Sequence, residues 1–297
     1  MSKYSFALRE GAEHKSKETG TGLRGLWKYS FPICAGILIL LLLGVSSRVE
    51  LLYDELTYVI GGATALRNFA TLTFAPEFWS FEFHPPFMMY FYGLAFGAYV
   101  VVRTLFTKGW VSIDELTIQA AILAKDETTI QFFRIPSFIA GVLILYFVYR
   151  WGEKLLGNRT GAVCSMILLI TLPPFIGMSS VAYLEIGMAL LQLMAAYYFL
   201  SSLKEKNWNQ YFLSAVLVGC AASTKIFAGV IGFVILVHML YWGRKEAARR
   251  GMTFPEALQW LNRNKKVFLW FPIVPLVIYI AWPWLWTDPS LFFKNLF

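Results

Sequence analysis

The sequence has few charged residues for its length. Charged residues make up 15% of the 297 positions, whereas hydrophobic residues make up 58%. Soluble globular domains carry about 25% charged residues, so this composition excludes a soluble domain. Aromatic residues account for 18% of the chain. That content excludes a disordered chain, because disordered segments are poor in the large apolar side chains that drive burial.

Cysteine is also scarce, and no nucleotide-binding loop is present. Cys34, Cys164 and Cys220 lie singly inside apolar blocks, so their spacing predicts neither a disulfide framework nor a zinc site. Gly20, Gly22 and Gly25 have the dinucleotide-binding spacing, but they precede an apolar block where that motif needs a βα unit. A net charge of +8 favours no nucleic-acid partner here, because the basic residues follow the membrane pattern described below.

Long apolar blocks predict an all-α polytopic membrane protein. Residues 32–49 would form a helix of about 27 Å, which is enough for one crossing. Five further blocks share this character: 135–149, 160–177, 183–201, 209–242 and 267–285. The block 209–242 is long enough for two short crossings, with Ser223, Thr224 and Lys225 at its polar middle, so it predicts a hairpin. The pattern therefore predicts about seven transmembrane helices.

The distribution of Lys and Arg predicts which ends of these helices face the cytosol. If residues 1–31 are cytosolic, the inner segments hold 18 of the 26 Lys and Arg residues but 7 of the 18 acids. This asymmetry is typical of the cytosolic side of membrane proteins. The sequence thus predicts a cytosolic segment, residues 1–31, followed by a transmembrane module, residues 32–297, with an outer loop at 50–134.

The apolar and aromatic stretch 87–102 is interpreted as an interfacial segment. A single crossing here would place the basic residues Arg150, Lys154 and Arg159 on the outer side, against the charge rule. We therefore expect residues 87–102 to lie in or dip into the outer interface, within a loop that forms juxtamembrane helices.

Ionisable residues collect at the predicted outer ends of the helices. Asp54 and Glu55 follow the first span, and His84 precedes Pro85 and Pro86 in the same loop. Arg134 begins the second span, and Glu185 begins the fourth. Lys225 lies at the tip of the predicted hairpin. Solvation, helix capping or snorkelling at the interface would also explain each of them individually.

Together these residues suit the transfer of a sugar from a lipid-linked phosphate to a hydroxyl group. Cations beside the leaving phosphate stabilise the charge that it gains in the transition state. A carboxylate within hydrogen-bond reach takes the proton of the acceptor hydroxyl. A second acid orients the acceptor or shares a divalent metal with the first.

The chain resembles the phospholipid-carrier-dependent glycosyltransferases of the GT-C fold, and is most similar to the protein O-mannosyltransferases (glycosyltransferase family 39). The resemblance rests on five features in order: Asp54 and Glu55, then His84 to Pro86, then Arg134 to Ser137, then Ser223 to Lys225, and finally Trp282 to Pro289 (WPWLWTDP). It implies a seven-helix module with juxtamembrane helices in the first outer loop.

The resemblance also implies roles for individual residues. Asp54 would be the catalytic base, with Glu55 supporting it. Glu185 falls where the family often has an Asp in the second outer loop and would be a further catalytic residue. Arg134, Lys225 and His84 would contact the donor phosphate. The implied partners are a polyprenyl-phosphate sugar donor, with mannose as the sugar, membrane lipids, and a protein Ser or Thr as the acceptor. The expected location is the plasma membrane, or the endoplasmic reticulum in a eukaryote, with the site on the outer face.

Two alternatives stay open from the sequence. One is glycosyl transfer to a lipid or a glycan, which would use the same donor site. The other is a non-catalytic membrane subunit or a transporter, although transporters place ionisable groups near the bilayer midplane. Family members usually continue past this point with more helices. The expectation is therefore a minimal or truncated version, or a partner subunit that supplies the missing C-terminal helices.

Overall fold

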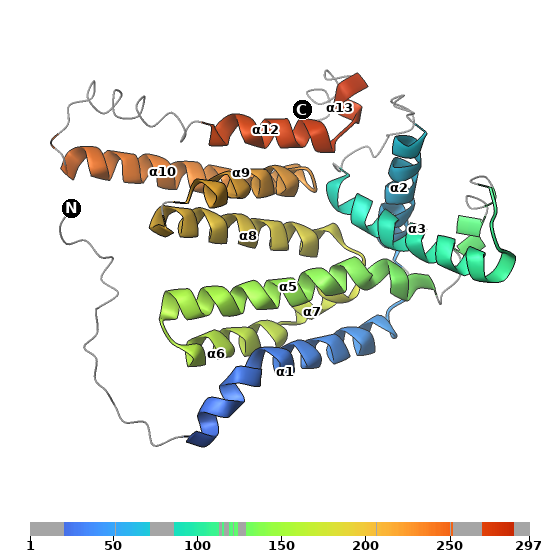
Figure 1. The fold of residues 1–297 in the computed structure, drawn as a ribbon, viewed down its shortest axis with the longest axis horizontal. Helices are drawn as coiled ribbons and strands as arrows, with labels where there is room; N and C mark the ends of the chain where they lie inside the picture. Colours follow the sequence, from blue (N-terminus) through green and yellow to red (C-terminus); the bar gives the residue numbers. More distant parts are fainter. Residues whose placement is uncertain are drawn as a thin grey trace.

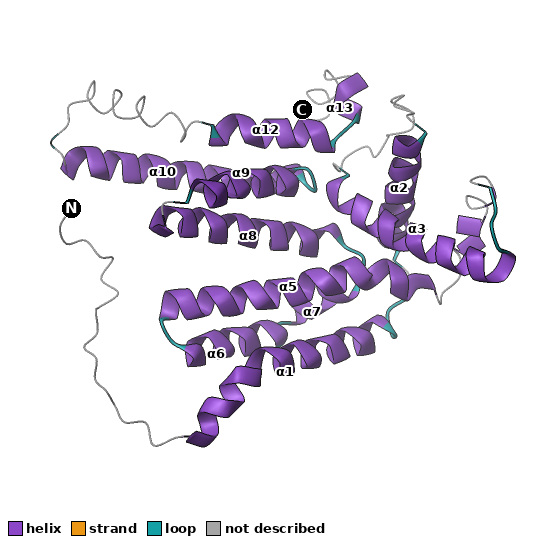
Figure 2. Cartoon of the chain, in the orientation of Figure 1, coloured by secondary structure: helices purple, strands orange, loops and turns teal. Residues whose placement is uncertain are grey.

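The structure is a computed structural model that describes residues 21–50, 52–71, 86–112, 115, 119–120, 122–123, 129–205, 207–249, 251 and 269–287. Within these residues every regular element is a helix, and no strand is present (Figure 2). This confirms the predicted all-α class. The N-terminal segment 1–20, His84 and residues 288–297 lie outside the described residues.

Most of the described helices overlap the apolar blocks of the sequence, whereas α2 lies in the predicted outer loop. In chain order they are α1 (Thr21–Ser46), α2 (Tyr53–Ala70), α3 (Phe87–Lys108), α5 (Ile130–Leu156), α6 (Arg159–Ile170), α7 (Pro173–Ser180), α8 (Leu184–Glu205), α9 (Trp208–Ala222), η3 (Ile226–Gly229), α10 (Val230–Arg249), α12 (Trp270–Ala281) and α13 (Trp284–Thr287).

Most of the long helices run in nearly the same direction, and α2 and α3 lie across one end of them (Figure 1). α5 packs against α1, α6 and α8, while α9 packs against α8 and α12. Large apolar side chains, including Leu40, Leu168 and Leu240, are exposed on the outside of this bundle. Such a surface is unfavourable in water but matches lipid tails, so the chain is a multi-pass membrane protein.

The count of seven crossings is not confirmed. Four described helices are long and apolar enough to span a membrane: Tyr29–Ser46, Phe87–Lys108, Gln131–Lys154 and Leu184–Leu203. α6 and α7 make a fifth if this pair, which is bent by 68°, counts as one broken span. Two further apolar helices, Ile226–Tyr241 and Trp270–Ala281, are shorter.

α3 contains the stretch that the sequence predicted to be interfacial, yet it meets the length and composition criterion for a span. In Figure 1 it runs obliquely across the end of the bundle, unlike α5 or α8. This direction fits an interfacial helix, and the interfacial placement stays a prediction.

Local signals set the turns between the helices. α5 ends at Gly157, whose φ of +68° favours glycine. The Asn158 side chain then accepts a hydrogen bond from Gly161 N (2.6 Å) and caps α6. α9 ends at Ala222, η3 begins at Ile226, and α10 runs back alongside α9 (Figure 1). The turn of the predicted hairpin in 209–242 is therefore present, while its two membrane crossings stay a prediction. Lys225 lies in the tight connection between α9 and η3.

Two glycines allow α2 and α3 to cross with their backbones in contact. A Cβ atom at Gly62 would lie 1.8 Å from the Met89 carbonyl oxygen, and one at Gly93 would lie 2.3 Å from the carbonyl carbon of Gly62. Because the opposing atoms belong to the backbone, no side-chain rotation relieves these overlaps. The crossing fixes α2, which carries Asp54 and Glu55 in its first turn.

We predict that Gly93→Ala separates α2 from α3 and destabilises the protein by about 1–3 kcal/mol, the usual cost of overpacking. The matched control is Gly97→Ala on the same helix, where a Cβ atom meets nothing within 4 Å. This control should be neutral or stabilising by up to about 1 kcal/mol, because alanine is the better helix former. Thermal unfolding of both detergent-purified variants tests the prediction, and equal midpoints would contradict it.

Candidate functional site

The predicted site residues converge at the end of the bundle where α2 and α3 lie. Asp54 and Glu55 come from the first turn of α2, Arg134 from the start of α5, Glu185 from the start of α8 and Lys225 from the hairpin tip. The described contacts join four of these residues in two pairs, Arg134 with Glu55 and Lys225 with Glu185. Their gathering at one membrane face stays a prediction. His84 lies outside the described residues.

Arg134 and Glu55 form an ion pair that is completely buried, with both side chains 0% exposed. Arg134 Nε donates to Glu55 Oε1 and Arg134 Nη2 donates to Glu55 Oε2, both at 2.8 Å. This two-point geometry matches the planar guanidinium to the planar carboxylate. Two buried charges are tolerated only when each is paired and hydrogen-bonded, and this pair meets that condition.

The guanidinium also satisfies backbone carbonyls beyond the end of α1. Arg134 Nη1 donates to the carbonyl oxygens of Ser46 (2.7 Å) and Val49 (3.1 Å). Arg134 Nη2 donates to the Glu50 carbonyl oxygen at 3.0 Å. The last carbonyls of a helix lack helical partners and attract a cation. The five N–H groups of Arg134 are therefore all engaged by the protein itself.

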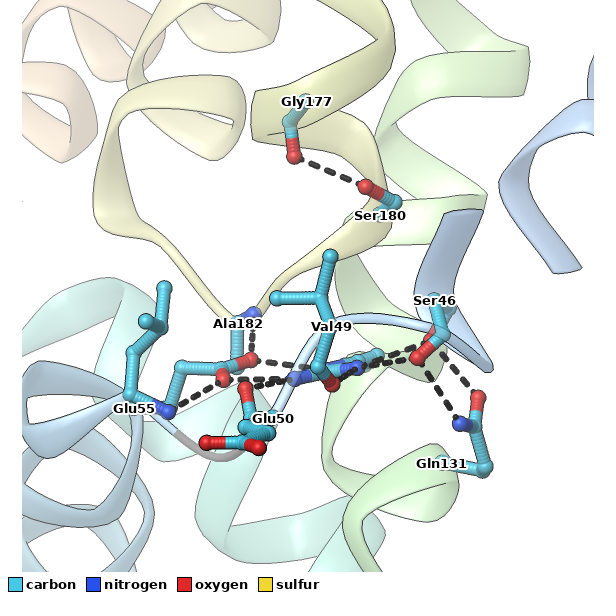
Figure 3. A network of polar contacts seen from close by, with 10 residues as sticks. Ser46, Val49, Glu50, Glu55, Gln131, Gly177, Ser180 and Ala182 are labelled. Carbon is cyan, nitrogen blue, oxygen red and sulfur yellow. Dashed lines mark hydrogen bonds and ion pairs between the residues drawn. The ribbon is translucent and has the colours of Figure 1, made fainter. Parts of the chain in front are cut away.

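Glu55 in turn joins α2 to the linker before α8, as Figure 3 shows. Its Oε1 accepts a hydrogen bond from Ala182 N at 2.6 Å, and its Oε2 accepts one from Leu52 N at 3.1 Å. The contact with Leu52 is the backward half of a capping box, in which the acid at the third helical position binds the N–H of the cap residue. Glu55 thus accepts four hydrogen bonds, the capacity of a carboxylate.

Ser46 and Gln131 reinforce the same junction (Figure 3). Ser46 Oγ donates to Gln131 Oε1 at 2.6 Å, and Gln131 Nε2 donates to the Ser46 carbonyl oxygen at 3.2 Å. These bonds attach the end of α1 to the first turn of α5. The backbone around Asp54 is therefore fixed from three directions, by α1, by α5 and by the linker at Ala182.

Asp54 differs from its neighbour because its side chain is exposed. Adjacent residues on a helix point about 100° apart, so Glu55 faces the buried junction while Asp54 faces away from it. Burial, together with the charges of Asp54 and Glu185, raises the pKa of Tyr58. Burial and the same two carboxylates raise the pKa of Tyr183. Both acids therefore act electrostatically on this tyrosine pair, whose ring centroids are 6.4 Å apart.

Glu185 and Lys225 form the second ion pair of the site. Lys225 Nζ donates to Glu185 Oε1, and the two side chains are 20% and 27% exposed, respectively. Unlike Arg134, Lys225 therefore keeps contact with the surroundings. The linker that leads into Glu185 is fixed by Tyr92, whose hydroxyl donates to the Tyr183 carbonyl oxygen at 2.5 Å.

The beginning of α3 lies against the hairpin tip. Phe87 N donates to the Ser223 carbonyl oxygen at 2.9 Å, and Tyr90 Oη donates to the Ala281 carbonyl oxygen at 2.9 Å. Pro86, which precedes this helix, therefore lies close to the connection that carries Lys225. The predicted phosphate contact of His84 stays a prediction.

The arrangement offers the exposed Asp54 carboxylate and the partly exposed Glu185–Lys225 ion pair at the same end of an apolar bundle. Arg134 and Glu55 are saturated by contacts within the chain, so their predicted roles at the substrate stay predictions and the geometry favours positioning. Among the described residues, no group of three His, Cys, Asp or Glu side chains is placed to hold a metal. The predicted divalent metal likewise stays a prediction.

Sequence reasoning did not find Tyr58, Tyr183 or the backbone N–H of Ala182. Tyr58 had a signal, because it lies one turn after Asp54 on the same face of a helix. Tyr183 was close to Glu185 in the sequence, but no motif marked it. The Ala182 contact had no signal, since a backbone N–H is present at every residue except proline.

Residues 116–258 match the family model of the dolichyl-phosphate-mannose-protein mannosyltransferases. This match confirms the resemblance predicted from the sequence and indicates a glycosyltransferase. The matched segment includes Arg134, Glu185 and Lys225, whereas Asp54 and Glu55 precede it. Comparisons with curated proteins and with solved structures gave no match.

We predict that Arg134→Leu destabilises the protein by about 3–5 kcal/mol, because it leaves the Glu55 carboxylate buried without its cation. Arg150→Leu, on the same helix, is the matched control. Arg150 is 51% exposed and lies 3.9 Å from Glu153, so its loss should cost about 1 kcal/mol or less. Thermal unfolding of the purified variants measures both effects. Similar losses in the two variants would show that the buried pair is not the stronger constraint.

Proposed function

We propose that this protein transfers mannose from a polyprenyl-phosphate donor to a hydroxyl group of a protein Ser or Thr, at the non-cytosolic face of the membrane. The observation that supports the proposal is that the exposed Asp54 carboxylate adjoins Glu55, which is hydrogen-bonded to Ala182, and that Ala182 is followed three residues later by Glu185 of the Glu185–Lys225 ion pair. The family match over residues 116–258 supports the same reaction class.

In this reaction the acceptor oxygen forms a bond to the anomeric carbon of the sugar, while the bond from that carbon to the phosphate oxygen breaks. Asp54 takes the proton of the acceptor hydroxyl, so the attacking oxygen gains electron density as the bond forms. The bonding electrons of the broken bond leave with the lipid phosphate. No oxidant, reductant or energy source is required, because the donor carries the activated sugar.

Lys225 is the cation best placed to face the leaving phosphate. The phosphate gains negative charge as the sugar departs, and a fixed ammonium group stabilises that charge more in the transition state than in the ground state. Arg134 supports this chemistry indirectly, because its engaged guanidinium fixes the turn of α2 that carries Asp54. The exposed apolar helices of the bundle provide the lipid-side surface that a polyprenyl chain requires.

Transfer to a lipid or glycan hydroxyl is the second candidate, because it uses the same base and the same cation. Purified protein with a labelled polyprenyl-phosphate mannose, offered a Ser/Thr peptide and a lipid acceptor side by side, separates the two. Label on the peptide supports the first proposal, and label on the lipid alone replaces it. Absence of label on either acceptor would refute both.

We predict that Asp54→Asn lowers the turnover of sugar transfer by about 10²- to 10⁴-fold, the usual contribution of a general base. Expression and unfolding temperature should stay unchanged, because this side chain is exposed. Glu115→Gln is the control: its carboxylate pairs with Lys108 and has no role in the proposed step. Wild-type turnover in Asp54→Asn would refute the assignment of the base.

We predict that Lys225→Met weakens donor use, with kcat/KM for the lipid-phosphate sugar falling by about 10-fold or more, as expected for loss of a hydrogen bond to a charged group. Lys154→Met is a closely matched control, because Lys154 also pairs with a glutamate of α8, Glu205, at 3.0 Å. That pair lies at the other end of α8. Equal losses in the two variants would exclude a specific role for Lys225.

A further inference from the structure

Glu185 uses only one of its two carboxylate oxygens. Lys225 Nζ donates to Oε1, whereas Oε2 is enclosed and accepts no hydrogen bond within the part of the chain that the structure describes. Buried acceptors in folded proteins are nearly always satisfied, and each exception needs an explanation. Three other enclosed side-chain atoms share this property, those of Thr129, Ser179 and Gln210. Glu185 is the charged member of the set.

The position of Glu185 explains where a partner would come from. Ala182, three residues before Glu185, donates a hydrogen bond to Glu55 at 2.6 Å, and Glu55 adjoins Asp54 in the first turn of α2, so Glu185 lies near the proposed base. The charges of both acids also raise the pKa of Tyr58 and of Tyr183. The Glu185 side chain keeps 27% exposure. Oε2 is enclosed, so a substrate group reaches it only after the carboxylate rotates about its terminal torsion, which is broad in glutamate.

The charge of the pair determines which chemical group fits Oε2. An anionic group is repelled by the carboxylate. A second cation has little to gain, because Lys225 already neutralises Glu185. An uncharged O–H group satisfies the orphaned oxygen without a further charge, and a hydrogen bond to an ionised acceptor is among the stronger kinds.

We propose that Glu185 Oε2 accepts a hydrogen bond from an uncharged hydroxyl group of the bound substrate, while Lys225 orients the carboxylate through Oε1. This rests on the proposed function, in which two hydroxyl sources meet at the site. One is a ring hydroxyl of the donor sugar, and the other is the acceptor. Glu185 is then a specificity-determining residue that selects either the donor sugar or the acceptor by its hydroxyl group. Asp54 remains the proposed base.

The test measures steady-state kinetics of the purified full-length chain with polyprenyl-phosphate mannose and a Ser/Thr peptide. Glu185→Gln keeps the shape of the side chain but removes its charge. Glu205→Gln is the matched control, because Glu205 also pairs with a lysine, Lys154, and ends the helix that Glu185 begins. We expect Glu185→Gln to lose about 10- to 100-fold in kcat/KM, and Glu205→Gln to retain wild-type kinetics.

Two measurements, release of mannose to water and transfer of mannose to the peptide, distinguish the source of the hydroxyl. If Glu185 holds the sugar, release of mannose from the donor to water falls together with transfer to the peptide. Donors that lack single ring hydroxyls should also lose activity with the wild-type protein, and the deoxy donor that lacks the contacted hydroxyl should cause no additional loss in Glu185→Gln. If Glu185 holds the acceptor, release to water is unchanged and the loss is confined to the peptide.

Outcomes that overturn the inference differ from those that overturn the proposed function. A wild-type protein that moves mannose from the donor to neither a hydroxyl acceptor nor water refutes the function and this inference with it. An active wild-type protein, with Glu185→Gln kinetics equal to those of the wild type, refutes this inference alone. If Glu185→Gln does not fold, the wild-type protein supplies the test. The inference is then refuted if wild-type activity changes neither with any deoxy donor nor with the concentration of the acceptor.

Discussion

The buried pair of Arg134 and Glu55 is the constraint on which the candidate site depends. Its partners belong to the end of α1, the start of α2, the start of α5 and the linker before α8. Removing either charge would leave the other without compensation in a region that water does not reach. Four segments are therefore held in one arrangement, and the site is built on the outward side of that junction.

Glu55 and Asp54, adjacent residues at the start of α2, have different surroundings. Glu55 points inward and is saturated by four hydrogen bonds, so its carboxylate is fixed and has no acceptor capacity to spare. Asp54 points outward and is exposed. Two consecutive acids on one helical turn point in these two directions because successive side chains on a helix diverge by about 100°. The proposed base, Asp54, thus lies on a fixed helical turn without being enclosed.

α8 carries a lysine–glutamate pair at each end, and the two pairs differ in their surroundings. At the Glu205 end, Lys154 also donates to Ser201 Oγ at 2.7 Å and lies 5.3 Å from the Tyr197 ring centroid. At the Glu185 end, one carboxylate oxygen is enclosed and has no hydrogen-bond partner among the described residues. The first pair is the more exposed at its glutamate, which is 48% exposed, whereas the second is the pair that we propose to contact a substrate.

The sequence by itself determined the membrane class, the hairpin at Ser223 to Lys225 and the gathering of charges at the ends of helices. Those properties are local, since apolar block length and the position of a charge relative to a block need no knowledge of neighbours. The tertiary structure decided which charges pair. Arg134 and Glu55 are 79 residues apart, Glu55 and Ala182 are 127 apart, and Lys225 and Glu185 are 40 apart. Helix packing brings such distant residues together. It buries Arg134 in the interior, whereas Asp54 stays exposed and Lys225 stays partly exposed.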